Sequence, residues 1–370
     1  EWEVTKRISY EVKDCQYCKG KLTKVSEIIR YIEDLILPLN NEYKLKEVTQ
    51  ETIQKWYCEK CKKWTFGKAI SSQESILWNW IRSFVVYANT VLRLSIEQTI
   101  EFLKTMWNIK ISDWEIINIM RKESVRLRWE YENIKERIRN WLWIHYDETT
   151  WWVQSLPWKM YAWVMSSIDW KDIVFSLWDT RWWWNLESLK WESKAIWISD
   201  DYWAYKNAFD HHQLCWAHPI RKVRDLVNST KLDNLKLWIC KIAYEKLRDI
   251  HKKILEMIKN VSINIESRKE IENEFDEVWK FVEWEPEKLR KIKESLIKNK
   301  SKYFTCLDFP WIPTTNNTAE RVLRPLVIKR KLCFWSKTSN WATMMEVIFS
   351  VVFSLLAKSK SMFIDRYLAI

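Results

Sequence analysis

Apolar residues recur at helical spacing in two long parts of the chain. From Ser72 to Asn140 they return every three or four positions, which places their side chains on one face of a helix. The stretch from about residue 225 to 300, rich in Lys, Glu and Ile, has the same spacing. This predicts an inserted helical hairpin with a charged outer surface. The residues aligned on its apolar face are Ile239, Ala243, Leu247, Ile250 and Ile254.

Residues 93–123, RLSIEQTIEFLKTMWNIKISDWEIINIMRKE, predict two helices joined by a short turn. Ser112 and Asp113 are suited to cap the second helix, and Trp107 falls at the junction, where glycine is typical. A helix-turn-helix that enters a DNA major groove has this layout. An ordinary helical hairpin has it too, and the pattern does not choose between the two.

At Leu142 the pattern changes to short β-branched and aromatic runs separated by turn residues, which is typical of consecutive strands. Strand-like and helix-like segments then alternate, as in an α/β layer. The first strands are predicted at LWIHYDE, TWWVQS, MYAWVMSS and DIVFSLW. The alternating part predicts helices at NLESLK, YKNAF and PIRKVRDLV, and strands at AIWISDD and QLCWAH.

Tryptophan and glycine have unusual frequencies, with 29 Trp and 2 Gly. Average usage of about 7% would give roughly 26 glycines in a chain of this length. Trp recurs where a turn needs a positive φ angle, as in LPWKM, SDDYWAY, DFPWIP and FWSKTSNWA. We interpret these as glycine positions of a gene in which UGA encodes glycine, shown here with UGA read as Trp. The alternative is a Trp-rich binding surface, and we expect genuine Trp at Trp163 and Trp216.

The chain is basic, with 61 Lys and Arg against 49 Asp and Glu, a formal net charge of +12 and a pI near 9.1. This balance favours a polyanionic partner, either nucleic acid or an anionic membrane surface. The longest apolar run, VIFSVVFSLLA, is too short to span a bilayer, and we recognise no signal peptide. We therefore expect a cytoplasmic protein without a membrane partner.

Four of the eight cysteines form two Cys-x-x-Cys pairs, Cys15 with Cys18 and Cys58 with Cys61. In a reducing cytoplasm such pairs predict a tetrahedral zinc site rather than disulfides. The gap between the pairs is longer than in most zinc ribbons, and we expect Ser26–Ile36 to form a helical insertion within it. The cysteines without paired spacing are expected in the core, and they are Cys215, Cys240, Cys306 and Cys333.

Three acidic residues stand out by their place in the pattern. Asp147 and Asp200 end apolar predicted strands, and the carboxyl ends of strands are where ligands collect in open α/β sheets. Asp201 follows directly, but strand alternation directs it to the other face. Glu320 lies in TTNNTAERVLRP, at the start of a predicted helix. The residues able to cap that helix are Thr315, Asn316 and Asn317.

Four segments together resemble the central region of IS66-type transposases: HYDETTWWV, ISDDYWAYK, LCWAHPIRK and TNNTAERVLRPLVIKRKLCFWSKTSNWA. The resemblance covers most of residues 72–360, and the last motif is its most specific part. The paired cysteines are placed like the zinc-binding domain that precedes this core in many members. Asp201 stands where the family commonly has glycine. Family glycines also correspond to Trp203, Trp335 and Trp341, and a Gly-containing loop to Trp182–Trp184.

The resemblance implies an α/β ribonuclease H-like core with an Asp-Asp-Glu triad at Asp147, Asp200 and Glu320. Such a triad holds two Mg²⁺ or Mn²⁺ ions, hydrolyses DNA at transposon ends and joins the freed 3′ ends to target DNA. It also implies a homo-oligomer on DNA and accessory transposition proteins. Residues expected to contact DNA are Arg321, Arg324, Lys329, Arg330, Lys331 and His218, although a solvated helix face and a structural histidine at a strand end are alternatives.

The resulting domain scheme has a zinc-binding module followed by a helical, helix-turn-helix-like region and a core split by an insertion. Two other functions remain compatible with the sequence: a non-catalytic, zinc-containing DNA-binding remnant of a transposase, and a structure-specific nuclease on the same fold. The predicted boundaries are 1–66 for the zinc module, 67–140 for the helical region, 141–224 and 306–370 for the core, and 225–305 for the inserted helical subdomain.

Overall fold

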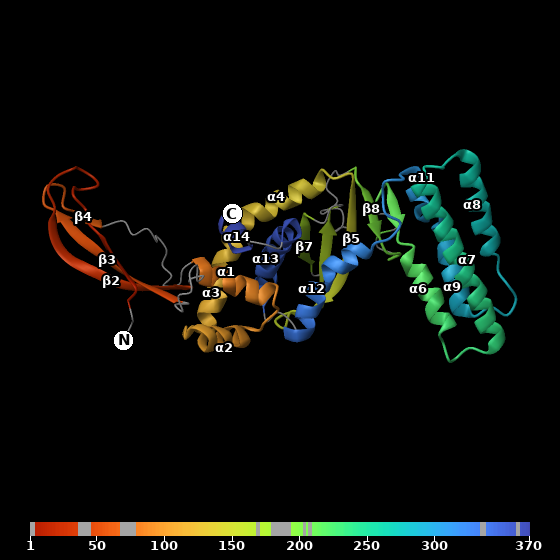
Figure 1. Cartoon of the computed structure of the whole chain (residues 1–370), viewed down its shortest axis with the longest axis horizontal. Coiled ribbons are helices and arrows are strands. Elements are labelled where there is room, and N and C mark those ends of the chain that lie inside the picture. The colour runs from red at the N-terminus through yellow and green to blue at the C-terminus, as the bar shows by residue number, and fades with distance from the viewer. Residues whose placement is uncertain are drawn as a thin grey trace, which may run out of the picture. The chain divides into compact units, whose positions relative to one another are not determined.

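The structure is a computed structural model, and it divides into two compact units, Glu1–Glu123 with Met362–Ile370, and Ser124–Ser361 (Figure 1). Each unit is described by itself. The predicted NLESLK helix lies outside the described residues, as do Trp182–Trp184, Trp203, Trp335 and most of the YKNAF segment. The residues that the structure describes are 4–35, 46–66, 79–167, 171–178, 194–202, 205, 209–333, 338–359 and 363–370.

The first unit begins with a four-stranded sheet in which two long strands, β2 and β3, pair antiparallel. Our expectation of a helix at Ser26–Ile36 is wrong for the described part of that segment, which belongs to β2. Its apolar positions fit helical spacing, but many of them are β-branched, and pairing with β3 decides the outcome. The strands are β1 (Lys6–Tyr10), β2 (Thr23–Leu35), β3 (Lys46–Cys58) and β4 (Lys63–Phe66).

Helices make up the rest of this unit, and the predicted helix pair is present as α2 and α3. Ser95 begins α2 with a capping box that includes Gln98, and the Ser112 hydroxyl accepts a hydrogen bond from the Glu115 amide of α3. The left-handed residue after α2 is Asn108, with φ 50°, whereas Trp107 is the last helical residue. The helices are α1 (Asn79–Thr90), α2 (Ile96–Trp107), α3 (Asp113–Arg126) and α14 (Phe363–Leu368).

The second unit is built on a five-stranded mixed sheet in the order β7-β6-β5-β8-β9. β5, β6 and β7 are antiparallel neighbours, while β8 and β9 run parallel to β5. The predicted TWWVQS strand is not separate, because β5 continues through Trp151 in register with β6. The strands are β5 (Trp143–Trp151), β6 (Met160–Ser166), β7 (Ile173–Trp178), β8 (Ile196–Ser199) and β9 (His212–Leu214).

Helices α4 (Arg128–Arg139) and α13 (Ser339–Lys358) lie against β7, and α12 (Asn317–Cys333) lies against β5 and β6 (Figure 1). α13 is long and apolar enough to cross a membrane. However, its Ser350 and Ser354 hydroxyls accept hydrogen bonds from β7 amides at 2.8 and 2.9 Å, and half of its apolar stretch is buried. This helix is therefore part of the core of the unit.

Between β9 and α12 the chain forms a helical subdomain with its own apolar core (Figure 1). The predicted apolar face is confirmed, since all five of its residues are buried in α7. The predicted hairpin is instead three long helices after α6, because Asn264 caps a separate α8 and Pro286 precedes α9. The helices are α6 (Ala217–Val227), α7 (Asn234–Lys259), α8 (Ile265–Val278), α9 (Glu287–Lys298), α10 (Lys300–Tyr303) and α11 (Thr305–Asp308).

The QLCWAH segment is strand only as far as Leu214, and its last residues enter α6. Pro219 explains the change, because proline has no amide for a strand ladder but is tolerated in the first turn of a helix. His218 consequently lies in the first turn of α6 rather than at the end of a strand.

The tryptophans differ in how well their surroundings suit an indole. Trp216 is fully buried, and its Nε1 donates to the Tyr303 carbonyl at 2.8 Å. Trp284 has φ 69° and is 69% exposed, a conformation that favours glycine. Trp341 lies in the first turn of α13, where its amide donates to Thr338. Buried indole N–H groups without a partner among the described residues belong to Trp56, Trp143, Trp163, Trp178, Trp197 and Trp279.

Candidate active site

Asp147 and Asp200 lie at equivalent places on adjacent parallel strands. The last registered pair of β5 and β8 is His145 with Ile198, and each aspartate follows two residues later on its own strand. Strand alternation therefore directs Asp147 to the same face as His145. Tyr146 faces the opposite side, where it stacks on Trp163 with ring centroids 5.4 Å apart. Asp200 directly follows the last residue of β8, at the carboxyl end of that strand.

Glu320 reaches this side of the sheet from the first turn of α12. Asn316 fixes the start of the helix, because its side-chain amide donates to the Tyr146 carbonyl at 2.7 Å and its Oδ1 lies 3.1 Å from Nδ1 of His145. Further along, the Arg330 guanidinium donates to both Thr149 and Thr150 of β5. The helix that carries Glu320 is thus bound to the strand that carries Asp147.

The three carboxyl groups influence one another electrostatically. Burial is the main reason that the pKa of Asp147 rises to about 8, and the negative charges of Glu148, Asp200 and Glu320 raise it further. Burial also raises the pKa of Asp200, although nearby His218 and Lys222 oppose the shift. The site therefore gathers more negative charge than its surroundings stabilise.

Two side chains of α6 meet Glu320. Nε2 of His218 lies 3.4 Å from a Glu320 oxygen, and the Arg221 guanidinium forms a two-pronged ion pair with the same carboxylate. Burial lowers the pKa of His218, with Asp200 and Glu320 acting in the opposite direction. The structure thus places His218 among the acids, in the position of a site residue.

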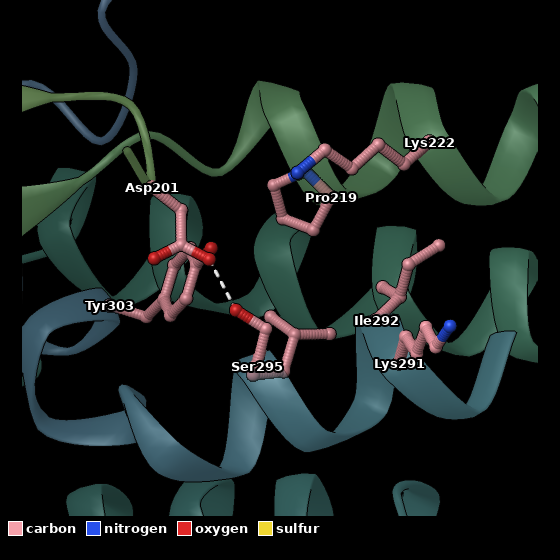
Figure 2. A pocket seen from close by; sticks show the side chains of 8 residues that line it. Asp201, Pro219, Lys222, Lys291, Ile292, Ser295 and Tyr303 are labelled. Atoms are coloured by element: carbon pink, nitrogen blue, oxygen red, sulfur yellow. Dashed lines mark hydrogen bonds between the residues drawn. The ribbon is translucent and has the colours of Figure 1, made fainter. Parts of the chain in front are cut away.

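Asp201 is directed away from these acids, as strand alternation predicts. Figure 2 shows its carboxylate pointing at Ser295 of α9, whose hydroxyl donates to it, and the Asn299 amide donates to it at 3.2 Å. These bonds lie beside a cavity of about 170 Å³ that Lys222 and Lys291 also line. Asp201 therefore connects the end of β8 to the inserted subdomain.

The five basic residues predicted on α12 do not share one environment. Arg321, Arg324 and Lys331 are exposed, whereas Lys329 is 5% exposed. Arg330 is occupied by its hydrogen bonds to β5. Lys329 and Arg330 are consequently placed to stabilise the fold, and the other three lie exposed on the surface of the helix.

The two Cys-x-x-Cys pairs of the first unit meet at one point. The Sγ atoms of Cys15, Cys18, Cys58 and Cys61 all lie within 4.8 Å of one another. Each pair is followed by a left-handed lysine, Lys19 at φ 56° and Lys62 at φ 55°, whose amide donates to the carbonyl of the first cysteine. Burial and the neighbouring thiols raise the pKa of Cys61 to about 12. Four thiolates at this spacing need a cation, and they form a candidate metal site.

Our sequence prediction did not include Glu148, Arg221 or Lys222 in the site. Glu148 was discoverable as the acid beside Asp147 in the Asp-Glu-Thr motif. Arg221 follows His218 by three positions on one helix, a spacing that places both on the same face. Its partner Glu320 lies 99 residues further along the chain, and that contact has no local signal.

A comparison with protein families identifies the chain as a transposase. The model described as the Transposase IS66 family matches residues 75–344, and the chain belongs to that family. The match confirms the resemblance drawn from the motifs, and it includes Asp147, Asp200, His218, Arg221 and Glu320. A comparison with curated proteins finds no match.

Proposed function

We propose that this chain is a DDE-type DNA transposase that cuts at transposon ends and joins the freed 3′ ends to target DNA. The observation that carries the proposal is the register of β5 and β8, which sets Asp147 beside Asp200 on adjacent strands. Glu320 supplies a third acid from α12, close enough to raise the pKa of Asp147. Membership of the transposase family supports assigning this acidic site to DNA chemistry.

The strand order supports a ribonuclease H-like core. Three antiparallel strands, β5 to β7, are extended by the parallel strands β8 and β9, and β5 lies at the centre of the sheet. The change from antiparallel to parallel pairing occurs between β6 and β8, on either side of Asp147. Ligands collect outside the carboxyl ends of strands at such a change in topology.

The donor set fits divalent cations. Asp147, Asp200 and Glu320 offer the oxygen ligands that Mg²⁺ and Mn²⁺ prefer, and burial, together with the neighbouring negative charges, raises the pKa of Asp147. When bound, a pair of these ions would supply activation of the attacking oxygen and stabilisation of the leaving oxygen.

The chain's own residues provide the positioning on which phosphoryl transfer depends. β5 and β8 fix the two aspartates through their ladder, and Asn316 fixes the start of α12. His218 and Arg221 lie against the Glu320 carboxylate. Arg321, Arg324 and Lys331 are the α12 residues that we assign to the DNA backbone. The four cysteines would hold a structural zinc ion, and transposon and target DNA would be joined by a homo-oligomer with accessory proteins.

The test compares isosteric variants of the three acids. Asp147→Asn, Asp200→Asn and Glu320→Gln keep the shape of each side chain but remove a charge, so end cleavage and strand transfer should fall below detection while DNA binding persists. The substrate is DNA that carries the element's own ends, with Mg²⁺, and the protein is made with UGA decoded as glycine.

Asp201→Asn is the matched control, because the asparagine oxygen can still accept from Asn299 while its amide donates to the Ser295 hydroxyl, and we place no role for Asp201 in the chemistry. It should retain both steps. Strand transfer by Asp147→Asn at the wild-type rate would refute the assignment. Cleavage without joining by the wild-type protein would identify a nuclease instead.

A further inference from the structure

Arg221 pairs with both oxygens of the Glu320 carboxylate. Nη1 donates to Oε2 at 3.3 Å, Nη2 donates to Oε1, and Nε2 of His218 lies 3.4 Å from Oε1. Both oxygens of Glu320 therefore face a nitrogen of α6. A bidentate guanidinium is a strong partner for a carboxylate, and it directs the oxygens toward itself.

The same guanidinium is accessible to solvent. The Arg221 side chain is 41% exposed, and among the described residues its other hydrogen bond runs from Nε to the Ala217 carbonyl within α6, at 3.3 Å. Nothing comparable holds Asp147 or Asp200, whose carboxylates accept hydrogen bonds from nearby backbone amides at 2.9 and 3.1 Å. Among the described residues, Glu320 is the one of the three acids that forms an ion pair with an arginine or a lysine.

We propose that Arg221 exchanges partners during assembly of the active complex: its guanidinium releases Glu320 to a divalent cation and binds a backbone phosphate of the DNA. The inference rests on the proposed function, because it assumes that metal and DNA meet at this site. It identifies Arg221 as a positioning residue that couples binding of the two. Guanidinium forks bind carboxylate and phosphate with the same geometry, so the exchange replaces one bidentate partner by another.

The exchange requires reciprocal effects. DNA that draws Arg221 away removes a competitor for Glu320, so DNA should tighten cation binding. By the same linkage, the cation should tighten DNA binding by an equal factor. If Arg221 were instead a fixed support for Glu320, its removal would weaken cation binding.

The experiment measures Mn²⁺ binding to the zinc-loaded protein from the electron paramagnetic resonance signal of free Mn²⁺, with and without a short DNA duplex. For the wild-type chain, DNA should lower the apparent Kd for Mn²⁺ by on the order of fivefold or more. Arg221→Gln should bind Mn²⁺ more tightly than wild type without DNA, by a similar factor, and DNA should then have little further effect. The matched control is Arg224→Gln, which removes an exposed arginine of the same helix and should behave as wild type.

A second variant tests the same exchange by changing Glu320 instead of Arg221. Glu320→Gln removes the charge that pairs with Arg221 and leaves the guanidinium able to bind a phosphate. In the absence of divalent metal, the slope of log DNA affinity against log salt should therefore steepen by about the amount that one phosphate contact contributes. This measurement does not depend on how well Arg221→Gln folds.

Weaker or unchanged Mn²⁺ binding by a folded Arg221→Gln protein, or an unchanged salt dependence for Glu320→Gln, would overturn the inference. Failure of the proposed function has a different signature. In that case the Mn²⁺ exchange is observed as expected, but the wild-type protein neither cuts nor joins transposon ends.

Discussion

Asp147 shows how strongly a single residue here depends on its neighbours. Its pKa rises from the usual 3.8 to about 8, so below pH 8 the metal-free site holds this group largely protonated. A raised carboxyl pKa means that stability is lost as the pH rises from the unfolded to the folded value.

The first prediction follows from this loss of stability with rising pH. In EDTA, Asp147→Asn should match the wild-type stability near pH 4 and exceed it increasingly up to about pH 8, because asparagine never ionises. At about pH 8 the free energy of unfolding of Asp147→Asn should exceed that of the wild type by at least about 1 kcal/mol, which corresponds to about 2–4 °C in melting temperature. Thermal unfolding at a series of pH values checks this. Added Mg²⁺ should reverse the order, and a wild-type protein that is the more stable one at pH 9 in EDTA would contradict the prediction.

The second prediction concerns two tryptophans. Trp284 has φ 69° and an exposed side chain, so Trp284→Gly should raise stability by about 1 kcal/mol through relief of the left-handed strain. Trp216→Phe should lower stability by about 1–3 kcal/mol, because the Tyr303 carbonyl loses one of its two buried side-chain donors and keeps Gln213 alone. Chemical denaturation measures both.

The coding DNA is the independent check on these two positions. We expect UGA at Trp284 and UGG at Trp216, and UGG at every tryptophan would rule out the recoding interpretation.

At the scale of elements, the sequence predicted best where the signal is local. Asp200 was found at a strand end because it directly follows the apolar run of β8, whereas Asp147, which was predicted to end its strand, lies within β5. The apolar face of α7 was found because its residues recur at helical spacing. Both signals can be read from neighbouring residues in the sequence alone.

The errors arose where a distant partner decides the structure. β2 has apolar positions that fit a helix, and β3, which lies beyond a further stretch of chain, makes it a strand. The α12 residues Arg321, Arg324 and Lys331 are separated by three and seven positions, so helical spacing alone would have distinguished them from Lys329 and Arg330. The Arg221–Glu320 pair has no such local signal.

The third prediction concerns the four cysteines that meet beside the first sheet. Cys58→Ser should abolish tight binding of one zinc ion per chain, because a serine hydroxyl does not replace a thiolate ligand. The strands that carry the cysteines should then become sensitive to protease, since binding energy at structural zinc sites is folding energy. Elemental analysis and limited proteolysis measure both effects. Cys240→Ala, a buried cysteine outside the cluster, should retain full zinc content, and zinc retention by Cys58→Ser would contradict the assignment.

At the scale of the whole molecule, the net charge of +12 makes salt the natural probe of DNA binding. The fourth prediction is that replacing Arg321, Arg324 and Lys331 together by Gln lowers the slope of log affinity against log salt by up to about 3, close to 0.9 for each lost phosphate contact. Fluorescence anisotropy with duplex DNA measures the slope.

A matched control removes the same charge elsewhere in the chain. Gln at three exposed lysines of the inserted subdomain should change the slope much less, and an equal change would assign the effect to net charge rather than to α12. The control residues are Lys236, Lys252 and Lys280.

The bonds that close the core join positions far apart in the chain: Asn316 with Tyr146, separated by 170 positions, and Ser354 with Ile173, separated by 181. A ribosome adds about 5–20 residues per second, so roughly 10–30 s pass between synthesis of Asp147 and of Glu320. From the synthesis of Asp200 until that of Glu320 the nascent chain has two of the acids and lacks the third. By the proposed assignment, a chain interrupted before Glu320 lacks the third acid of the site, so an unfinished product would not cut DNA.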